Sequence, residues 1–156
     1  MFSKQEASTL KKKFWTAFGH YIKPIPSADG EKINWINYKT GVKNIAFWMD
    51  VSGKKAFVAI EISHADLNVQ QLYFEQFLAM KKRITEAVGK GWNWQLHTTN
   101  EMVKTISSIS ISLGNVSLLN KNDWPALISF FKTYMIALDD FWSEAKYGFE
   151  TMSYEL

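Results

Sequence analysis

The spacing of hydrophobic residues at the start of the chain predicts a helix. Ser3 and Glu6 have the spacing of a capping box, in which each side chain accepts a hydrogen bond from the other residue's backbone N–H. Gly19 and Pro24 predict that the helix ends near Tyr21. Its apolar side chains recur at steps of three and four, as one helix face requires, at Ala7, Leu10, Phe14, Ala17 and Tyr21.

The stretch from Asn44 to Ser63 is the one around which the other predicted elements are arranged. Two apolar runs meet at Ser52-Gly53, which predicts a β-hairpin. In the first run both sets of alternate residues are largely apolar, a pattern typical of a central strand covered on both sides. Turn length sets the register of a hairpin, and turns of two and three residues remain alternatives here.

Three further segments alternate with the period of a strand. Residues 33–38 follow a loop with two prolines, and residues 92–96 carry tryptophan on one face. In residues 108–113 serine alternates with isoleucine and leucine, while Ile106 is out of phase, which predicts a β-bulge near Ser107. No histidine or lysine is interleaved to activate a serine hydroxyl, so we interpret the serine row as a solvated sheet surface.

Two more helices follow from helical spacing. Asp66 is the expected N-cap of one, and Gly89 its expected end. The apolar face of this helix comprises Val69, Tyr73, Phe77, Met80, Ile84 and Val88. The last helix opens around residues 122–125, where an Asx cap and an early proline are both favourable. Its buried face is expected to comprise Leu127, Ile128, Phe131, Met135, Leu138, Trp142 and Ala145.

These elements predict one α+β domain that spans residues 1–156. The order is helix, three strands, helix, two strands, helix, without an internal repeat or a linker. A single mixed or antiparallel sheet of about five strands, covered by helices, is the economical arrangement. A chain of this length is expected to bury a self-sufficient core.

Composition narrows the classes of function. The absence of cysteine excludes disulfides, thiolate zinc sites and cysteine nucleophiles. The N-terminus is charged where a signal peptide is apolar, and no apolar run approaches about 20 residues, so we expect a cytoplasmic protein without a membrane segment. The net charge of +3 permits an acidic partner. Arg83 is the only arginine, which disfavours sequence-specific reading of DNA.

Motifs along nearly the whole chain resemble the family known as Domain of Unknown Function 4268. They are the Lys-Lys-Phe-Trp at 12–15, the hairpin bounded by Gly41, the aromatic helix at 73–88 with Phe77 and Lys82, the Gly-Trp-Asn-Trp at 91–94, and the Asn-Asp-Trp at 122–124. The resemblance implies a bacterial or archaeal domain, sometimes carried behind a nuclease-like domain. It implies no established activity and no catalytic residues.

The predicted order of elements is also similar to the core of restriction-endonuclease-like nucleases, which carry an Asp on the second strand and a Glu-x-Lys on the third. Asp50 and Glu61 occupy similar elements here, but Ser63 stands where those enzymes have lysine. The hairpin would separate the two acids by about five residues, or about 16 Å. Two-metal chemistry needs carboxylates that converge on ions about 4 Å apart, so the sequence disfavours an active nuclease.

The histidines show no spacing typical of a metal site, since His20, His64 and His97 lie far apart on different predicted elements. We expect no metal site, no cofactor and no catalytic residue. Glu61, His64 and Asp66 form a polar group at the junction of a strand and a helix. This junction is the polar group most in need of structural inspection.

A binding function is the remaining hypothesis. Five basic residues, together with the 15% of aromatic residues, are candidates for contact with nucleic acid. They are Lys54, Lys55, Lys81, Lys82 and Arg83. In the alternative interpretation the lysines are solvated and the aromatic residues fill the core. The sequence therefore predicts a non-catalytic accessory or binding domain, with nucleic acid as the preferred partner and protein interaction or self-association as the alternative.

Overall fold

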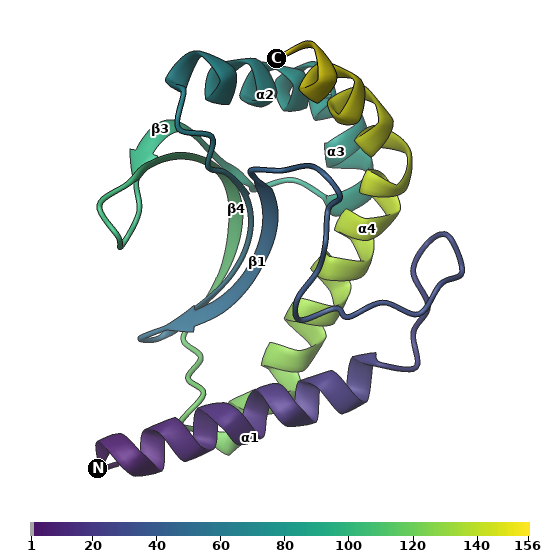
Figure 1. Cartoon of the computed structure of the whole chain (residues 1–156). Coiled ribbons are helices and arrows are strands. Elements are labelled where there is room, and N and C mark those ends of the chain that lie inside the picture. The colour runs from purple at the N-terminus through teal and green to yellow at the C-terminus, as the bar shows by residue number, and fades with distance from the viewer. Residues whose placement is uncertain (1) are drawn as a thin grey trace.

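The computed structural model describes residues 2–156, which fold into four α-helices, a short 3-10 helix and one four-stranded antiparallel sheet (Figure 1). The α+β prediction is confirmed, and the strand count is close to the expected five. Among the described helices, none has the length and apolar character of a membrane span. The elements, in chain order, are α1 (Lys4–Ile22), β1 (Ile45–Ser52), β2 (Lys55–Ile62), α2 (Leu67–Ala79), α3 (Lys81–Val88), β3 (Asn93–Thr99), β4 (Thr105–Gly114), η1 (Lys121–Asp123) and α4 (Trp124–Glu155).

Helix α1 begins as its capping residues predict. The Ser3 Oγ accepts a hydrogen bond from the Glu6 N–H at 3.1 Å, and the Glu6 carboxylate accepts one from the Ser3 N–H at 3.4 Å. These two bonds satisfy backbone donors that have no partner within the helix. Its buried residues, Phe14, Phe18 and Ile22, then face α4 and the core.

The strands are ordered β1-β2-β4-β3, so β1 lies at one edge of the sheet. The prediction that its apolar sequence marks a central, doubly covered strand was therefore wrong. Ser52 pairs with Lys55, which resolves the hairpin register in favour of a two-residue turn. Gly53 in that turn has φ of 58°, in the left-handed region that glycine adopts without a steric penalty.

The predicted bulge lies opposite Ser107 and belongs to the partner strand. Gln95 pairs with Ser108 and Thr98 pairs with Ile106, so two β3 residues, including His97, stand opposite Ser107. The backbone N–H of His97 donates to the Ser107 Oγ at 3.1 Å. That hydroxyl in turn donates to the buried side chain of Gln70, at 2.7 Å. The bulge is therefore anchored to α2.

Residues 33–38 were expected to form a strand, and this prediction was wrong. The Asn34 Oδ1 accepts hydrogen bonds from the N–H groups of Ile36 and Asn37, at 3.1 and 3.0 Å, which closes a local turn. Such bonds compete with strand pairing. Trp35 is 2% exposed and donates its indole N–H to the Ile25 carbonyl at 2.9 Å. The apolar residues here anchor an ordered loop instead of a sheet edge.

The helix expected between Asp66 and Gly89 is divided at Met80, whose φ and ψ are −99° and 9°. Its two ends are as predicted. The Asp66 carboxylate accepts from the backbone N–H groups of Asn68 and Val69, and Gly89 ends α3 with φ of 82°. The break lets α2 and α3 turn separately around α4 (Figure 1).

The sheet curls strongly, and α4 runs along its outer, convex side while α1 crosses below (Figure 1). We call the side toward the helices the covered face. Its β2 residues alternate with residues that are half-buried or, at Lys55, exposed, and Ala56, Val58, Ile60 and Ile62 are all 0% exposed. The main core therefore lies between this face and the helices, which leaves the concave side of the sheet without a helical cover.

Candidate functional site

The concave side of the sheet carries a second set of alternate residues, which we call the open face. Strand pairing places these residues side by side across all four strands. They are Ala46, Trp48 and Asp50 of β1, Lys55, Phe57, Ala59 and Glu61 of β2, Ser108, Ser110 and Ser112 of β4, and Asn93 and Gln95 of β3. The row of serines predicted to be a solvated surface lies within this face.

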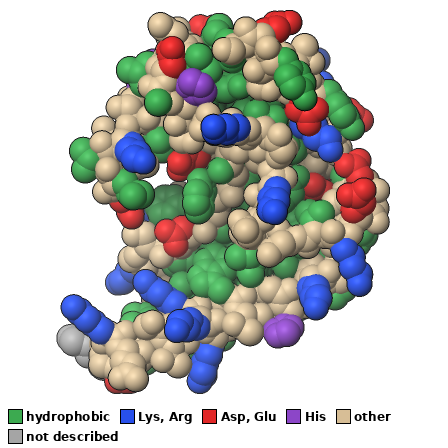
Figure 2. Space-filling model, in the orientation of Figure 1, with side chains coloured by type: hydrophobic (Ala, Val, Ile, Leu, Met, Phe, Trp, Pro, Cys, Tyr) green, Lys and Arg blue, Asp and Glu red, His purple; other side chains and the backbone are tan. Residues whose placement is uncertain are grey.

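The open face forms a groove because it lies on the concave side of the sheet, and at the level of Trp48 its central side chains are small. Ala59 and Ser110 pair with each other on the two central strands, between Trp48 at one edge and Asn93 at the other. Figure 2 shows a hollow on this side of the molecule, with hydrophobic atoms in its depth. A ligand that enters the groove thus meets both apolar and hydrogen-bonding groups.

Trp48 is the aromatic residue that departs from the pattern of the others. It is 53% exposed and makes no ring contact with another described aromatic side chain. Each of the other tryptophans does make such a contact, and they are Trp15, Trp35, Trp92, Trp94, Trp124 and Trp142. Trp48 pairs with Ala59, so the half-buried Phe57 is its diagonal neighbour, with the two Cα atoms about 7–8 Å apart. Two aromatic side chains therefore adjoin on the open face.

Glu61 lies in the floor of the groove. It is half-buried, it pairs with Ala46 and Ser108 on the neighbouring strands, and burial raises the pKa of its carboxyl above the ordinary 4.5. Burial is the only cause of this shift, with no contribution from a charge or a hydrogen bond of another described residue. None of the residues that the structure describes forms a hydrogen bond or an ion pair with this carboxylate.

The two acids of the nuclease hypothesis lie on the same face but do not converge. Asp50 pairs with Phe57, four residues along β2 from Glu61, which corresponds to about 13 Å. Asp50 instead accepts a hydrogen bond from the N–H of Val51, at 2.8 Å. The described residues contain no group of three side chains able to hold a metal ion. The arrangement lacks the carboxylate pair that two-metal chemistry uses.

The predicted basic residues of the hairpin lie at one end of the groove. Lys54 is in the turn between β1 and β2, and Lys55 is exposed on the open face, two residues from Phe57. Residues of one face two apart on a strand are about 6.6 Å apart. These two lysines therefore lie at the end of the groove next to Phe57.

The other three predicted basic residues belong to α3, on the covered side of the sheet. The Lys81 Nζ lies 5.6 Å from the centre of the Trp94 ring, which alternates with the open-face residues of β3. Arg83 forms an ion pair with Glu144 at 3.1 Å, and Lys82 lies between them in the sequence. The structure thus does not bring these residues together with Lys54 and Lys55.

The polar junction after β2 has a structural arrangement. The backbone N–H of Asp66 donates to the His64 Nδ1 at 3.0 Å, and the Asp66 carboxylate caps α2. Glu61 contacts neither through a hydrogen bond or an ion pair. His20, His64 and His97 lie on α1, on the loop before α2 and on β3.

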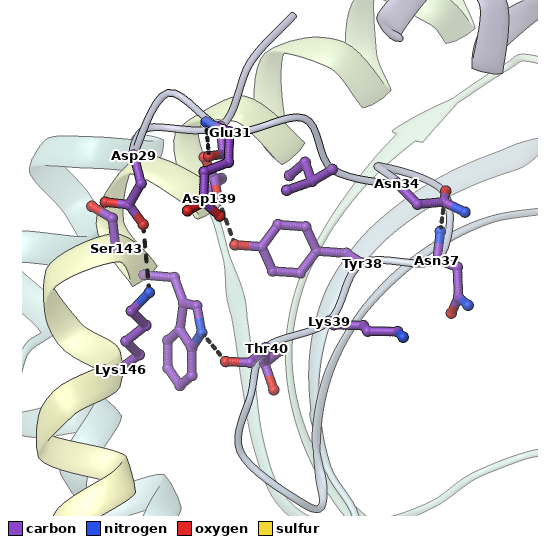
Figure 3. Close-up of a pocket in the computed structure, with 13 residues that line it drawn as sticks. Asp29, Glu31, Asn34, Asn37, Tyr38, Lys39, Thr40, Asp139, Ser143 and Lys146 are labelled. Atoms are coloured by element: carbon purple, nitrogen blue, oxygen red, sulfur yellow. Dashed lines mark hydrogen bonds and ion pairs between the residues drawn. The ribbon is translucent and has the colours of Figure 1, made fainter.

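A cavity of about 410 Å³ lies between the loop that precedes β1 and helix α4 (Figure 3). One of its two buried polar residues, Asp139, is 6% exposed and accepts hydrogen bonds from the Tyr38 hydroxyl at 2.6 Å and the Ala28 N–H at 2.7 Å. The Trp142 indole donates to the Thr40 carbonyl at 2.7 Å. Burial, followed by the bond to Asp139, raises the pKa of Tyr38. Because these groups bond to one another, they hold the loop on α4.

Sequence reasoning did not single out Trp48 or Asp139. Trp48 is two residues from Asp50 on β1, so the alternation of the strand indicates that both side chains lie on the same face. Asp139 follows Leu138 on the buried side of the last helix, next to a long loop rich in proline and asparagine. An acid at such a position indicates a tether for the loop.

Comparison with known proteins identifies the family but no function. No curated protein and no solved structure shows significant similarity to the chain. The family model named Domain of unknown function (DUF4268) matches residues 10–146, most of the 156-residue chain. The chain therefore belongs to this family of uncharacterised domains.

Proposed function

We propose that the protein is a non-catalytic binding domain that holds single-stranded nucleic acid on its open face. The observation that carries this proposal is the exposed Trp48 beside Phe57 on a concave sheet without a helical cover. Aromatic side chains on a sheet are a common platform for unpaired bases. Stacking of this kind tolerates any base, because every base has a π face.

The charges around the groove support a polyanion that runs along its rim. Lysine side chains gather over α1 and the β1-β2 turn, below the hollow in Figure 2. Lys55 lies on the same face as Phe57, so a base stacked on Phe57 would carry its phosphate past Lys54 and Lys55. Such contacts are not specific for sequence, which fits a chain with a single arginine.

The absence of a catalytic role is part of the proposal and rests on the geometry of the polar groups. Asp50 and Glu61 are about 13 Å apart along β2. The serines of the open face pair with Phe57, Ala59 and Glu61 of β2, and with Asn93 and Gln95 of β3. Among the described residues, no hydrogen bond joins their hydroxyls to Glu61 or to a histidine. A serine hydroxyl needs an adjacent base before it acts as a nucleophile.

The test is fluorescence anisotropy with a labelled single strand of 12 nucleotides and mixed sequence, alongside its duplex. We expect the single strand to bind more tightly, and its affinity to fall steeply between about 50 and 200 mM salt. Trp48→Ala should weaken binding about fivefold or more, because stacking contributes about 1–3 kcal/mol per base and 1.4 kcal/mol is a factor of ten. Tyr147→Ala is the matched control, since Tyr147 is 60% exposed on α4, away from the sheet.

Equal effects of the two substitutions, or no binding at low salt, would overturn the proposal. Sedimentation velocity at the same concentrations distinguishes it from self-association through the open face. A dimer that dissociates on Trp48→Ala and binds no oligonucleotide would favour that alternative.

A further inference from the structure

Glu61 is the one acidic residue of the groove floor, and its surroundings offer it no charge. The paired residues beside it are Ala46 and Ser108, and Gln95 follows Ser108 on β3. The charged residues of the open face, Asp50 and Lys55, lie four and six residues away along the register, or about 13 and 20 Å. The half-buried carboxylate therefore faces only neutral side chains.

A carboxylate in this position is unfavourable unless something donates to it. Partial removal from water destabilises an ionised carboxyl, and hydrogen-bond donors offset that penalty. The same chain supplies two donors to its other buried acid, Asp139, through Tyr38 and Ala28. The carboxylate of Asp139, which holds the loop, thus has hydrogen-bond donors within the chain. Among the described residues Glu61 has none, and it lies where the groove is open to a ligand. Groups held at a cost in stability are a common property of binding sites.

The position of Glu61 relative to Trp48 indicates what the donor is. Trp48 pairs with Ala59, and Ala59 lies between Phe57 and Glu61 on the same face of β2. Glu61 is therefore a diagonal neighbour of Trp48, about 7–8 Å away, as Phe57 is on the other side. A flat ring that stacks on Trp48 and extends over Ala59 would bring its edge to the carboxylate.

We infer that Glu61 accepts a hydrogen bond from the exocyclic amino group of a base stacked on Trp48, so that the groove prefers amino bases to keto bases. This inference rests on the proposed function and adds a specificity to it. A carboxylate accepts from the N4 amino group of cytosine, whereas it repels the O4 carbonyl that uracil has at the same place. The remaining polar groups, Ser110 and Asn93, can both donate and accept, and so discriminate less.

The test compares oligo-dC with oligo-dU of the same length by anisotropy, at neutral pH and about 50 mM salt, on the full chain. We expect oligo-dC to bind about tenfold more tightly, since a hydrogen bond to a charged group contributes about 1.5–3 kcal/mol and 1.4 kcal/mol is a factor of ten. Glu61→Ala should weaken oligo-dC and leave oligo-dU unchanged or stronger. Glu61→Gln should also reduce the preference, because an amide both donates and accepts.

Asp50→Ala is the matched control, as it removes an exposed acid from the same face and should keep the preference. Trp48→Ala should weaken both oligonucleotides, and oligo-dC at least as much as oligo-dU, because the base that contacts Glu61 is the one stacked on Trp48. Equal binding of oligo-dC and oligo-dU by the unaltered protein, or a preference that survives Glu61→Ala, would overturn the inference and leave the proposed function standing. Failure to bind either strand would overturn both.

Discussion

The two faces of the sheet are made by alternate residues of the same strands, yet they differ in almost every physical respect. On β2, Val58 and Ile60 are 0% exposed beneath α4, while their neighbours Ala59 and Glu61 are only half-buried. The covered face contacts the helices through large aliphatic and aromatic side chains. The open face carries small residues, hydroxyls, amides and two exposed or half-buried aromatic rings.

The faces also differ in how their polar groups are paired. Near the covered face, every buried polar side-chain atom among the described residues has a hydrogen-bond partner. Gln70, at 0% exposure, bonds to two carbonyls and to the Ser107 hydroxyl. On the open face Glu61 has none. The difference suggests that one face stabilises the fold and the other is left for a ligand.

A large effect is expected from a cavity on the covered face. Ile60→Ala removes a fully buried side chain between the sheet and the helices, and should lower the free energy of unfolding by about 2–5 kcal/mol. Ser110→Ala, on the paired strand but the open face, should change it by less than about 0.5 kcal/mol. Urea denaturation measures both. Similar losses for the two variants would contradict the division into a structural and a free face.

The tether of the loop to α4 belongs to the structural side of this comparison. Tyr38→Phe removes one of the two donors to the buried Asp139, and should cost about 1.5–3 kcal/mol, the range for hydrogen bonds to charged groups. Hydrogen exchange should show faster exchange in residues 25–40, with β4 unaffected. Binding of a single strand to the open face should not change. A variant as stable as the parent would show that the loop is held without this bond, by the Ala28–Asp139 and Trp142–Thr40 hydrogen bonds and the buried Trp35.

Local signals predicted the helices well and the edges of the sheet poorly. The capping residues Ser3 and Asp66 act within one turn of their own helices, so sequence spacing defines them. Residues 33–38 have the alternation of a strand, but the Asn34 side chain satisfies the neighbouring N–H groups. The apolar pattern of β1 predicted a central strand because Trp48 is apolar on the side that proved open. Which strand is an edge depends on contacts between distant segments.

The open face could be predicted only in part. The serine row indicated a solvated surface, and serines alternate in the sequence itself. That Trp48 and Glu61 share this surface depends on the register of β1 and β2, which a one-residue change of turn length would reverse. The curl of the sheet, which makes the surface concave, depends on packing against α4. No sequence pattern within a single strand predicts it.

Two tryptophans sharpen the comparison at a smaller scale. Trp142 is 1% exposed and contacts Phe47, Phe77 and Phe149, so Trp142→Ala should be destabilising by about 3–5 kcal/mol. Trp48→Ala should lower the free energy of unfolding by less than about 1 kcal/mol, because half of its surface is already in water. Thermal unfolding of both variants is the measurement. A large loss for Trp48→Ala would mean that the ring is structural and would remove the reason for placing a ligand on it.

The smallest expected effect is an increase in stability, in Glu61→Gln. Burial raises the pKa of Glu61, so the folded chain holds this proton more tightly than the unfolded chain does. Its contribution to stability is fully present below the ordinary pKa of 4.5 and is lost as pH rises through the raised value in the folded chain. Glu61→Gln keeps the size of the side chain and removes the charge.

At neutral pH this variant should therefore be more stable than the parent, by no more than about 1 kcal/mol, because Glu61 is only half-buried and solvent screens its charge. Below about pH 4 the two proteins should be equally stable, since Glu61 is then protonated in both the folded and the unfolded parent chain. Urea denaturation at about pH 4 and pH 7 gives both differences. If the stability difference between the variant and the parent does not grow with pH, the ionised carboxylate already has hydrogen-bond donors in the folded chain. The presence of Glu61 would then need no ligand to explain it. If the variant is instead more stable than the parent only above the raised pKa, the ionised Glu61 lowers the stability of the parent chain.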